Sequence, residues 1–187
     1  MSMSRWPGLV KWQFRSPRYP LIPLDDPRLR EAAVPLPDSE MARAVSTIRS
    51  LEDTLHWFRA WHGSAHGIAA PQIGIPERII IVERDGRGCP MVNPVITRES
   101  GESRQVWERC MSFPHLAICV RRPVRLSVRF VTREGTPCLW EDLDPDLASV
   151  VRHEVDHLDG ILTLDRAEGP EGVVPWDTMR DHHLPWH

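Results

Sequence analysis

Residues 152–160 contain the string His153-Glu154-Val155-Asp156-His157, in which two histidines stand four residues apart and a glutamate follows the first. On an α-helix, side chains four residues apart lie on one face, one turn apart along the axis. Two such imidazoles can bind a single metal ion, and the glutamate can reach a water molecule at that metal and act as general base. The string therefore requires a helix and predicts a metal-dependent hydrolase. A solvated helix face with two incidental histidines is the alternative.

The residues around the string favour a helix. Asp144-Pro145 offers an N-cap followed by a proline at the first helical position, and Gly160 offers a stop. Between them, apolar residues recur at helical spacing and form one stripe: Leu147, Val151, Val155 and Leu158. The histidines fall off this stripe, so the helix is expected to have a core side and a chemical side. Arg152 and Asp156 are expected to form an ion pair at the surface.

The helix face that carries His153 continues towards the helix start through Ser149 and Asp146. Asp146 would lie about 10 Å back along the axis, too far to bind the metal but placed to line a pocket beside it. An aspartate in the first turn is also favoured simply by the helix dipole. Both interpretations of Asp146 stay open at this point.

The composition predicts one ordinary globular domain. A chain of 187 residues can bury one substantial core, so we expect a single catalytic domain over 1–187. The formal net charge of −3 gives no reason to expect a nucleic-acid or membrane partner. The first residues lack the apolar core of an export signal. The four cysteines form no CxxC pair, so we expect free thiols and a cytoplasmic location.

The order of the expected elements indicates an α+β fold. Residues 1–38 are rich in proline and predict an extended arm over the surface, and 167–187 predict a C-terminal tail. Asp38-Ser39-Glu40 can cap a helix whose apolar stripe runs to Phe58. Strands are expected where apolar residues run or alternate: 78–83, 91–98, 105–112, 124–132 and, after a hairpin turn at 133–136, 138–140. Strands between an early helix and a late metal-binding helix are typical of α+β domains.

Two histidines leave a catalytic metal short of ligands, because such sites have three protein ligands and one open position. Candidates for the third ligand lie downstream of the string: Asp165, Glu168, Glu171, His182 and His183. Upstream stands Cys110, in the string Trp107-Glu108-Arg109-Cys110-Met111-Ser112. Cys110 could also be a small buried hydrophobic residue.

The string at 107–112 resembles the peptide deformylase motif in which Glu-Gly-Cys-Leu-Ser supplies a cysteine ligand. Further upstream, Gly67-Ile68-Ala69-Ala70-Pro71-Gln72 resembles the glycine-rich motif of the same family, which ends in glutamine. With the histidine string, the three motifs stand in the family's order, and the similarity runs from about residue 25 to about residue 166. The resemblance implies a fold of antiparallel β-sheets around a central helix that carries the histidines.

The resemblance also implies the metal site and the reaction. Cys110, His153 and His157 would bind one divalent metal ion, which is Fe(II) in the family and can be replaced by Zn(II) or Ni(II). Glu154 would activate the attacking water and pass its proton to the leaving amine. The reaction would remove the N-formyl group from formylmethionyl peptides of newly made proteins, with nascent chains at the ribosome as possible partners. An ordinary protease carrying the histidine string is disfavoured by the upstream cysteine motif.

Two further groups would stabilise the oxyanion of the tetrahedral intermediate, namely Gln72 and the backbone N–H of Met111. Gly67 would allow close approach of the substrate backbone. The residues expected to bind substrate in this reading are Ala65, His66, Gly67, Arg109, Asp146 and Ser149.

The chain departs from the family at three motif positions. Ala65 and Arg109 stand where the family has glycine, and Arg152 stands where it has glutamine. With Asp146 and Ser149 on the histidine face, the substrate pocket is expected to be polar. The substrate could then be another small formylated compound, and a non-catalytic metal-binding relative is a further alternative.

Overall fold

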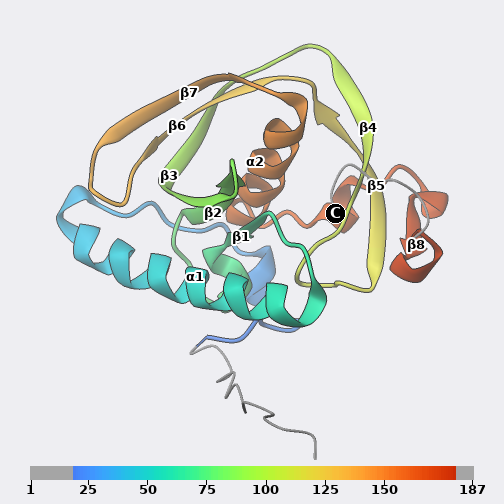
Figure 1. Ribbon diagram of the computed structural model, residues 1–187, viewed down its shortest axis with the longest axis horizontal. Coiled ribbons are helices and arrows are strands. Elements are labelled where there is room, and N and C mark those ends of the chain that lie inside the picture. The colour runs from blue at the N-terminus through green and yellow to red at the C-terminus, as the bar shows by residue number, and fades with distance from the viewer. Residues whose placement is uncertain (1–18, 180–187) are drawn as a thin grey trace, which may run out of the picture.

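The computed structural model describes residues 19–179, and in this part of the chain two α-helices and eight strands form an α+β fold (Figure 1). The helices are α1 (Met41–His62) and α2 (Pro145–Leu158). The strands are β1 (Gly67–Ala69), β2 (Ile79–Arg84), β3 (Arg87–Glu99), β4 (Ser103–Glu108), β5 (Leu116–Pro123), β6 (Leu126–Val131), β7 (Pro137–Leu143) and β8 (Val173–Pro175). Within the described residues, neither helix has the length and apolar character needed to cross a membrane.

The strands form two antiparallel sheets on either side of α2. The larger sheet has the order β1-β2-β3-β6-β7, and the smaller has the order β4-β5-β8. Helix α2 contacts β1 and β2 of the larger sheet and β5 of the smaller one. The expected arrangement of antiparallel sheets around the central helix is therefore confirmed (Figure 1).

Strand β2 explains how the larger sheet joins two cores. Its side chains alternate between faces. Ile79 and Ile81 pack in the cluster that contains the apolar stripe of α1, and Ile80 and Val82 pack in the cluster that contains the stripe of α2. Because both faces of this strand are covered, it is an unbroken apolar run rather than an alternating pattern.

Helix α2 begins and ends where the sequence predicts. The side chain of Asp144 accepts hydrogen bonds from the backbone N–H groups of Asp146 and Leu147, both at 3.0 Å. Gly160 adopts a φ of +72°, a conformation that favours glycine after a helix end. The apolar stripe of α2 is buried, so its core side is also confirmed.

Helix α1 follows a different start from the one expected. Asp38–Glu40 form a 3₁₀ turn, and no side chain caps the first turn of α1, which begins at Met41. The apolar stripe itself is confirmed, since Ile48, Leu51 and Phe58 are buried against the sheet.

The smaller sheet is the part of the fold that the sequence reading missed. Its strands β5 and β8 were not expected, and β4, which corresponds to the strand expected over 105–112, ends at Glu108. Strand β1 of the larger sheet was not expected either. Beyond it the chain turns, because the N–H of Phe113 donates to the carbonyl of Cys110 at 3.1 Å. This turn lifts Cys110 out of the sheet and points it towards α2.

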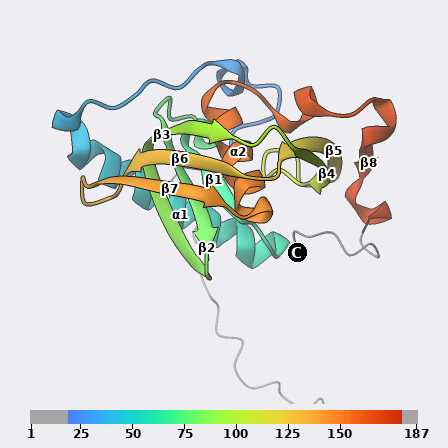
Figure 2. The same cartoon turned by 90° about the horizontal axis from the view of Figure 1, so that it is seen from above.

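Both ends of the described chain are tied to the core. The N–H of Ala33 donates to the carbonyl of Leu158 at the end of α2, at 2.8 Å, and Leu29 is fully buried. Residues 19–38 thus cover the core, along one edge of the molecule in Figure 2. Of the expected tail, β8 pairs with β5, and only 167–179 are described. The candidate ligands His182 and His183 lie outside the described residues.

Candidate metal centre

Three of the predicted ligands meet at one point. Candidate ligand atoms of Cys110, His153 and His157 all lie within 4.8 Å of one another, and all three residues are buried. The Sγ of Cys110 is 3.2 Å from the Nε2 of His157. The histidines project from successive turns of α2, and Cys110 arrives from the turn after β4. Among the described residues, the downstream carboxylates do not join a cluster of this kind.

Glu154 lies beside these ligands and is buried, with 4% of its surface exposed. Its Oε2 atom has no hydrogen-bond partner among the described residues. Burial raises the pKa of Glu154 to about 7, and the neighbouring histidines only partly oppose this. A carboxyl group with such a pKa can take up and release a proton near neutral pH.

Strand β1 holds Glu154 through a close approach that only glycine permits. A Cβ atom at Gly67 would lie 2.5 Å from the Oε1 and 2.8 Å from the Cγ of Glu154. The sequence reading expected Gly67 to make room for substrate. In the structure it makes room for the glutamate and also lines the pocket, and its role towards substrate stays a prediction.

The candidate ligands shift the pKa values of one another. Burial alone would raise the pKa of the Cys110 thiol, but His157 and His153 outweigh burial and hold it well below its usual value. Burial alone would lower the pKa of His153, but its contacts with Cys110 and Glu108 raise it well above the usual value. A thiolate beside imidazole nitrogens is a donor set that binds borderline divalent metals.

The sequence reading missed Glu108, which orients His153. The Oε2 of Glu108 lies 2.9 Å from the Nδ1 of His153, and the Oε1 of Glu108 accepts a hydrogen bond from the hydroxyl of Ser149 at 2.8 Å. Arg122 adds two hydrogen bonds of 2.8 Å, one to each oxygen. A carboxylate bound to the far nitrogen of a histidine fixes the ring and directs its Nε2 towards a metal. The sequence did offer one signal for Glu108, because it stands in the same motif string, two residues before Cys110.

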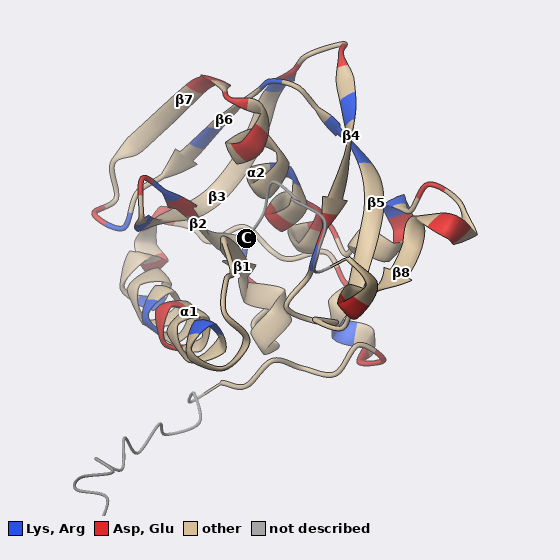
Figure 3. Ribbon diagram, turned by 45° about the vertical axis from the view of Figure 1, so that its right-hand side comes forward, with Lys and Arg blue, Asp and Glu red and all other residues tan. Residues whose placement is uncertain are grey.

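The ion pair between Arg152 and Asp156 forms at 3.0 Å, but it is not the surface pair expected. Asp156 is 1% exposed and also accepts hydrogen bonds from Arg122, at 2.7 Å, and from Arg166, at 2.9 Å. Arg122, itself 2% exposed, thus ties α2 to Glu108 at the end of β4. Acidic and basic positions are interspersed over α2, β4 and β5 (Figure 3).

Gln72, in the turn after β1, contacts the candidate ligand Cys110. Its Oε1 accepts a hydrogen bond from the N–H of Ala69 at 2.8 Å, which turns its Nε2 towards the site. The Nε2 lies 3.6 Å from the Sγ of Cys110 and 3.1 Å from the hydroxyl of Ser112. Met111 is buried and lines the same pocket.

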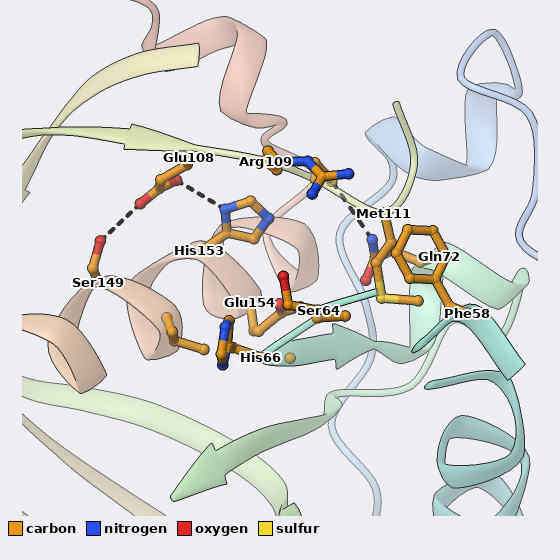
Figure 4. A pocket seen from close by; sticks show the side chains of 14 residues that line it. Phe58, Ser64, His66, Gln72, Glu108, Arg109, Met111, Ser149, His153 and Glu154 are labelled. Atoms are coloured by element: carbon orange, nitrogen blue, oxygen red, sulfur yellow. Dashed lines mark hydrogen bonds and ion pairs between the residues drawn. The ribbon is translucent and has the colours of Figure 1, made fainter. Parts of the chain in front are cut away.

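These groups line one pocket, shown in Figure 4. Five of the six residues expected to bind substrate are in its wall: Ala65, His66, Gly67, Arg109 and Ser149. The structure does not bring Asp146 to this pocket, since it lines a neighbouring hollow and pairs with Arg104. The guanidinium of Arg109 lies 4.2 Å from the ring centre of Trp176. The other lining residues are two of the three candidate ligands, three polar groups beside them and four further side chains: Cys110, His153, Gln72, Glu108, Glu154, Phe58, Ser64, Met111 and Val150.

The residues present fit a metal ion. Besides the three converging ligand atoms, the Oε2 of Glu154 is buried beside them without a hydrogen-bond partner among the described residues. Buried polar atoms are rarely left unpaired, so the site is built around a group that completes it. Two histidines and a cysteine with an adjacent carboxyl group define a mononuclear metal-dependent hydrolase.

Comparison with known proteins identifies the family. The family model for polypeptide deformylase matches residues 19–172, so the chain belongs to the polypeptide deformylase family. A peptide deformylase of Heliobacterium modesticaldum is 38% identical over 151 residues, which cover 80% of this chain and 94% of that protein. One from Treponema pallidum is 42% identical over 112 residues, covering 59% of this chain and 68% of that protein.

Solved structures agree with the family assignment. The peptide deformylase of Synechococcus elongatus, determined in complex with actinonin, superposes with a TM-score of 0.77 at 29% identity. The match covers 91% of this chain and 90% of that one. The enzyme of Thermotoga maritima superposes with a TM-score of 0.72 at 28% identity, covering 81% of this chain and 98% of that one.

Proposed function

We propose that this chain is a peptide deformylase that hydrolyses the N-formyl group of formylmethionyl peptides of newly made proteins and releases formate. The observation that carries the proposal is the convergence of Cys110, His153 and His157 beside the unpaired carboxyl oxygen of Glu154, with Cys110, His153 and Glu154 in the wall of one pocket. The family to which the chain belongs supplies the substrate class.

The three convergent residues would hold one divalent ion, for which we propose Fe(II), with Zn(II) or Ni(II) as replacements. When bound, such an ion polarises the formyl carbonyl and lowers the pKa of a water molecule. Glu108 keeps His153 in the orientation that presents its Nε2.

Glu154 would remove a proton from the attacking water and deliver it to the leaving amine. Its raised pKa suits it to both steps, because the group can be ionised before the attack and protonated afterwards. The Nε2 of Gln72 and the backbone N–H of Met111 would donate hydrogen bonds to the oxyanion that develops on the formyl oxygen. The amide of Gln72 is held in the donating orientation by Ala69.

The pocket wall favours formylmethionyl peptides over a substrate with a charged side chain. Asp146 is paired with Arg104, and the hydroxyl of Ser149 already donates its hydrogen bond to Glu108. Apolar lining remains at Phe58, Met111 and Val150. His66 in the pocket wall is the feature that favours the alternative of a small polar formylated compound. A non-catalytic relative would have no use for the unpaired oxygen of Glu154.

The same proposal includes the setting of the reaction. Nascent chains are the source of formylated N-termini, so the chain would act in the cytoplasm, near ribosomes, without binding nucleic acid or membrane. All four cysteines are free in the described structure, which suits a reducing compartment.

Formate release tests the function. Protein loaded anaerobically with Fe(II) should release formate from formyl-Met peptides, with a kcat/KM well above those for matched formyl-Asp and formyl-Lys peptides. Burial of a methionine side chain in apolar surroundings stabilises binding by about 1.5–3 kcal/mol, so the preference should be about tenfold or more. A higher kcat/KM for a charged peptide would contradict the methionine preference and support the alternative of a polar substrate. No formate from any of the three would support the non-catalytic relative.

Metal analysis tests the ligand assignment. Cys110→Ala removes one of three ligands and should lower metal retention on dialysis strongly. Cys119→Ala, which removes a buried thiol outside the cluster, should retain metal as the unaltered protein does. If Cys110→Ala retained all of its metal, Cys110 would not be a ligand, and the third ligand would be one of the downstream candidates.

A further inference from the structure

The turn that carries Cys110 is contacted on its outer side by the segment after β8. We call residues 109–115, between β4 and β5, the Cys110 loop. The guanidinium of Arg109 lies over the ring of Trp176, 4.2 Å from its centre. The backbone N–H of Trp176 donates to the carbonyl of His115 at 2.8 Å. Both ends of the loop therefore contact one residue that lies more than sixty positions away in the chain.

Arg109 also bridges the loop itself. Its Nη2 donates to the carbonyl of Pro114 at 3.3 Å, so one guanidinium joins the start of the loop to its end while the indole lies against its face. Strand β8 pairs in register with β5, Leu116 opposite Pro175, which places Trp176 next to the point where β5 begins. The contact is thus anchored by regular strand pairing.

The inner side of the loop faces the metal centre. There the Nε2 of Gln72 contacts the Sγ of Cys110 and the hydroxyl of Ser112. The loop therefore lies between Gln72 on the inside and Trp176 on the outside. A backbone fixed on both sides can hold a thiol and a neighbouring N–H within the narrow tolerance that catalysis needs.

We propose that Trp176, acting through Arg109, is a positioning residue that fixes the shape of the Cys110 loop. It thereby orients the thiol of Cys110 and the backbone N–H of Met111. This proposal rests on the proposed role of Cys110 as a metal ligand. It also gives a physical reason for Arg109, because its cationic side chain has an aromatic face and a carbonyl to contact.

A double-mutant cycle tests the proposal, with Trp176→Leu, Arg109→Met and the double variant. The first readout is the rate at which iodoacetamide alkylates Cys110 in metal-free protein at one pH, followed at that residue by mass spectrometry. The second is the rate of metal loss to a chelator, and the third is kcat and KM for formyl-Met peptide. Trp176→Phe keeps an aromatic face and should recover part of each effect.

We expect Trp176→Leu to speed both alkylation and metal loss by about two- to fivefold, the scale of one cation–π contact. It should lower kcat while KM changes little. The double variant should be no worse than the worse single variant, because the two residues act as a unit. The control is Trp140→Leu, which removes the indole from a similar contact with Arg84, 4.6 Å from its ring centre and outside the metal pocket.

Unchanged alkylation of Cys110 in Trp176→Leu would overturn the proposal, as would effects of the two single variants that add in the double variant. So would an equal effect of Trp140→Leu, because it would point to general loosening. The alkylation readout needs no metal. Faster alkylation together with full metal retention in Cys110→Ala would therefore overturn the ligand assignment alone and leave the positioning of the loop standing.

Discussion

At the scale of single residues, the site depends on the contact between Gly67 and Glu154. A methyl group at position 67 would lie 2.5–2.9 Å from three atoms of the glutamate, so Gly67→Ala should displace its carboxyl group. A shift of about 1 Å in a catalytic group can cost about 100-fold in rate. We expect kcat to fall on that scale in metal-loaded Gly67→Ala. Gly101→Ala, whose methyl would meet no atom within 4 Å, should be unchanged. Equal kcat in both variants would mean that the glutamate tolerates displacement.

Glu154 itself gives the second prediction at this scale. Glu154→Gln keeps the shape of the side chain and removes its ability to take up a proton, so it should bind metal and lose turnover by about 10²–10⁴-fold. Formate release and metal content measured on the same sample separate the two effects. The exposed Glu141→Gln is the matched control. Turnover within a few-fold of the unaltered enzyme, at full metal content, would remove Glu154 from the proton-transfer role.

At the scale of elements, Arg122 joins α2 to β4 through Asp156 and Glu108. Removing one charge from a buried ion pair costs about 3–5 kcal/mol, so Asp156→Asn should lower the free energy of unfolding by about that amount at pH 7. Glu99→Gln, which removes an exposed partner of Arg152, should change it by less than about 1 kcal/mol. Urea unfolding of metal-free protein measures both.

The ion pairs of Asp156 also predict that the free energy of unfolding depends on pH. Burial would raise the pKa of Asp156, but Arg122, Arg166 and Arg152 outweigh it and hold the pKa below its ordinary value. A carboxyl group whose pKa is lowered by folding stabilises the protein above its unfolded pKa, about 3.9, and loses that contribution as the pH falls through the folded value. The difference between the unaltered protein and Asp156→Asn should therefore shrink below about pH 4. A difference that stays constant down to pH 3 would contradict this account.

At the scale of the whole molecule, the N-terminal arm is part of the core. Leu29 is 1% exposed and packs in the cluster that contains Cys110 and Leu162. Leu29→Ala should lower the free energy of unfolding by about 2–5 kcal/mol, the range for a buried leucine. Leu24→Ala, at a position that is 39% exposed, should cost far less. Similar costs at both positions in urea unfolding would mean that the arm contributes little to the core.

Local patterns in the sequence determined the metal helix and much of the larger sheet. The histidine spacing, the apolar stripe of α2 and the cap at Asp144 depend on residues within a turn or two of one another. The alternation in β6 and the turn at 133–136 are local in the same sense. Such signals are readable from one sequence because helical and strand periodicity repeats over a few residues.

Only the tertiary structure decided which polar groups surround the metal centre. Helical spacing put Asp146 on the histidine face, but Arg104 of β4 pairs with it outside the pocket. Glu108 reaches His153 from a segment far away in the chain, and Trp176 reaches Arg109 through the pairing of β8 with β5. These contacts depend on strand pairing between distant segments. Periodicity within one element carries no information about it.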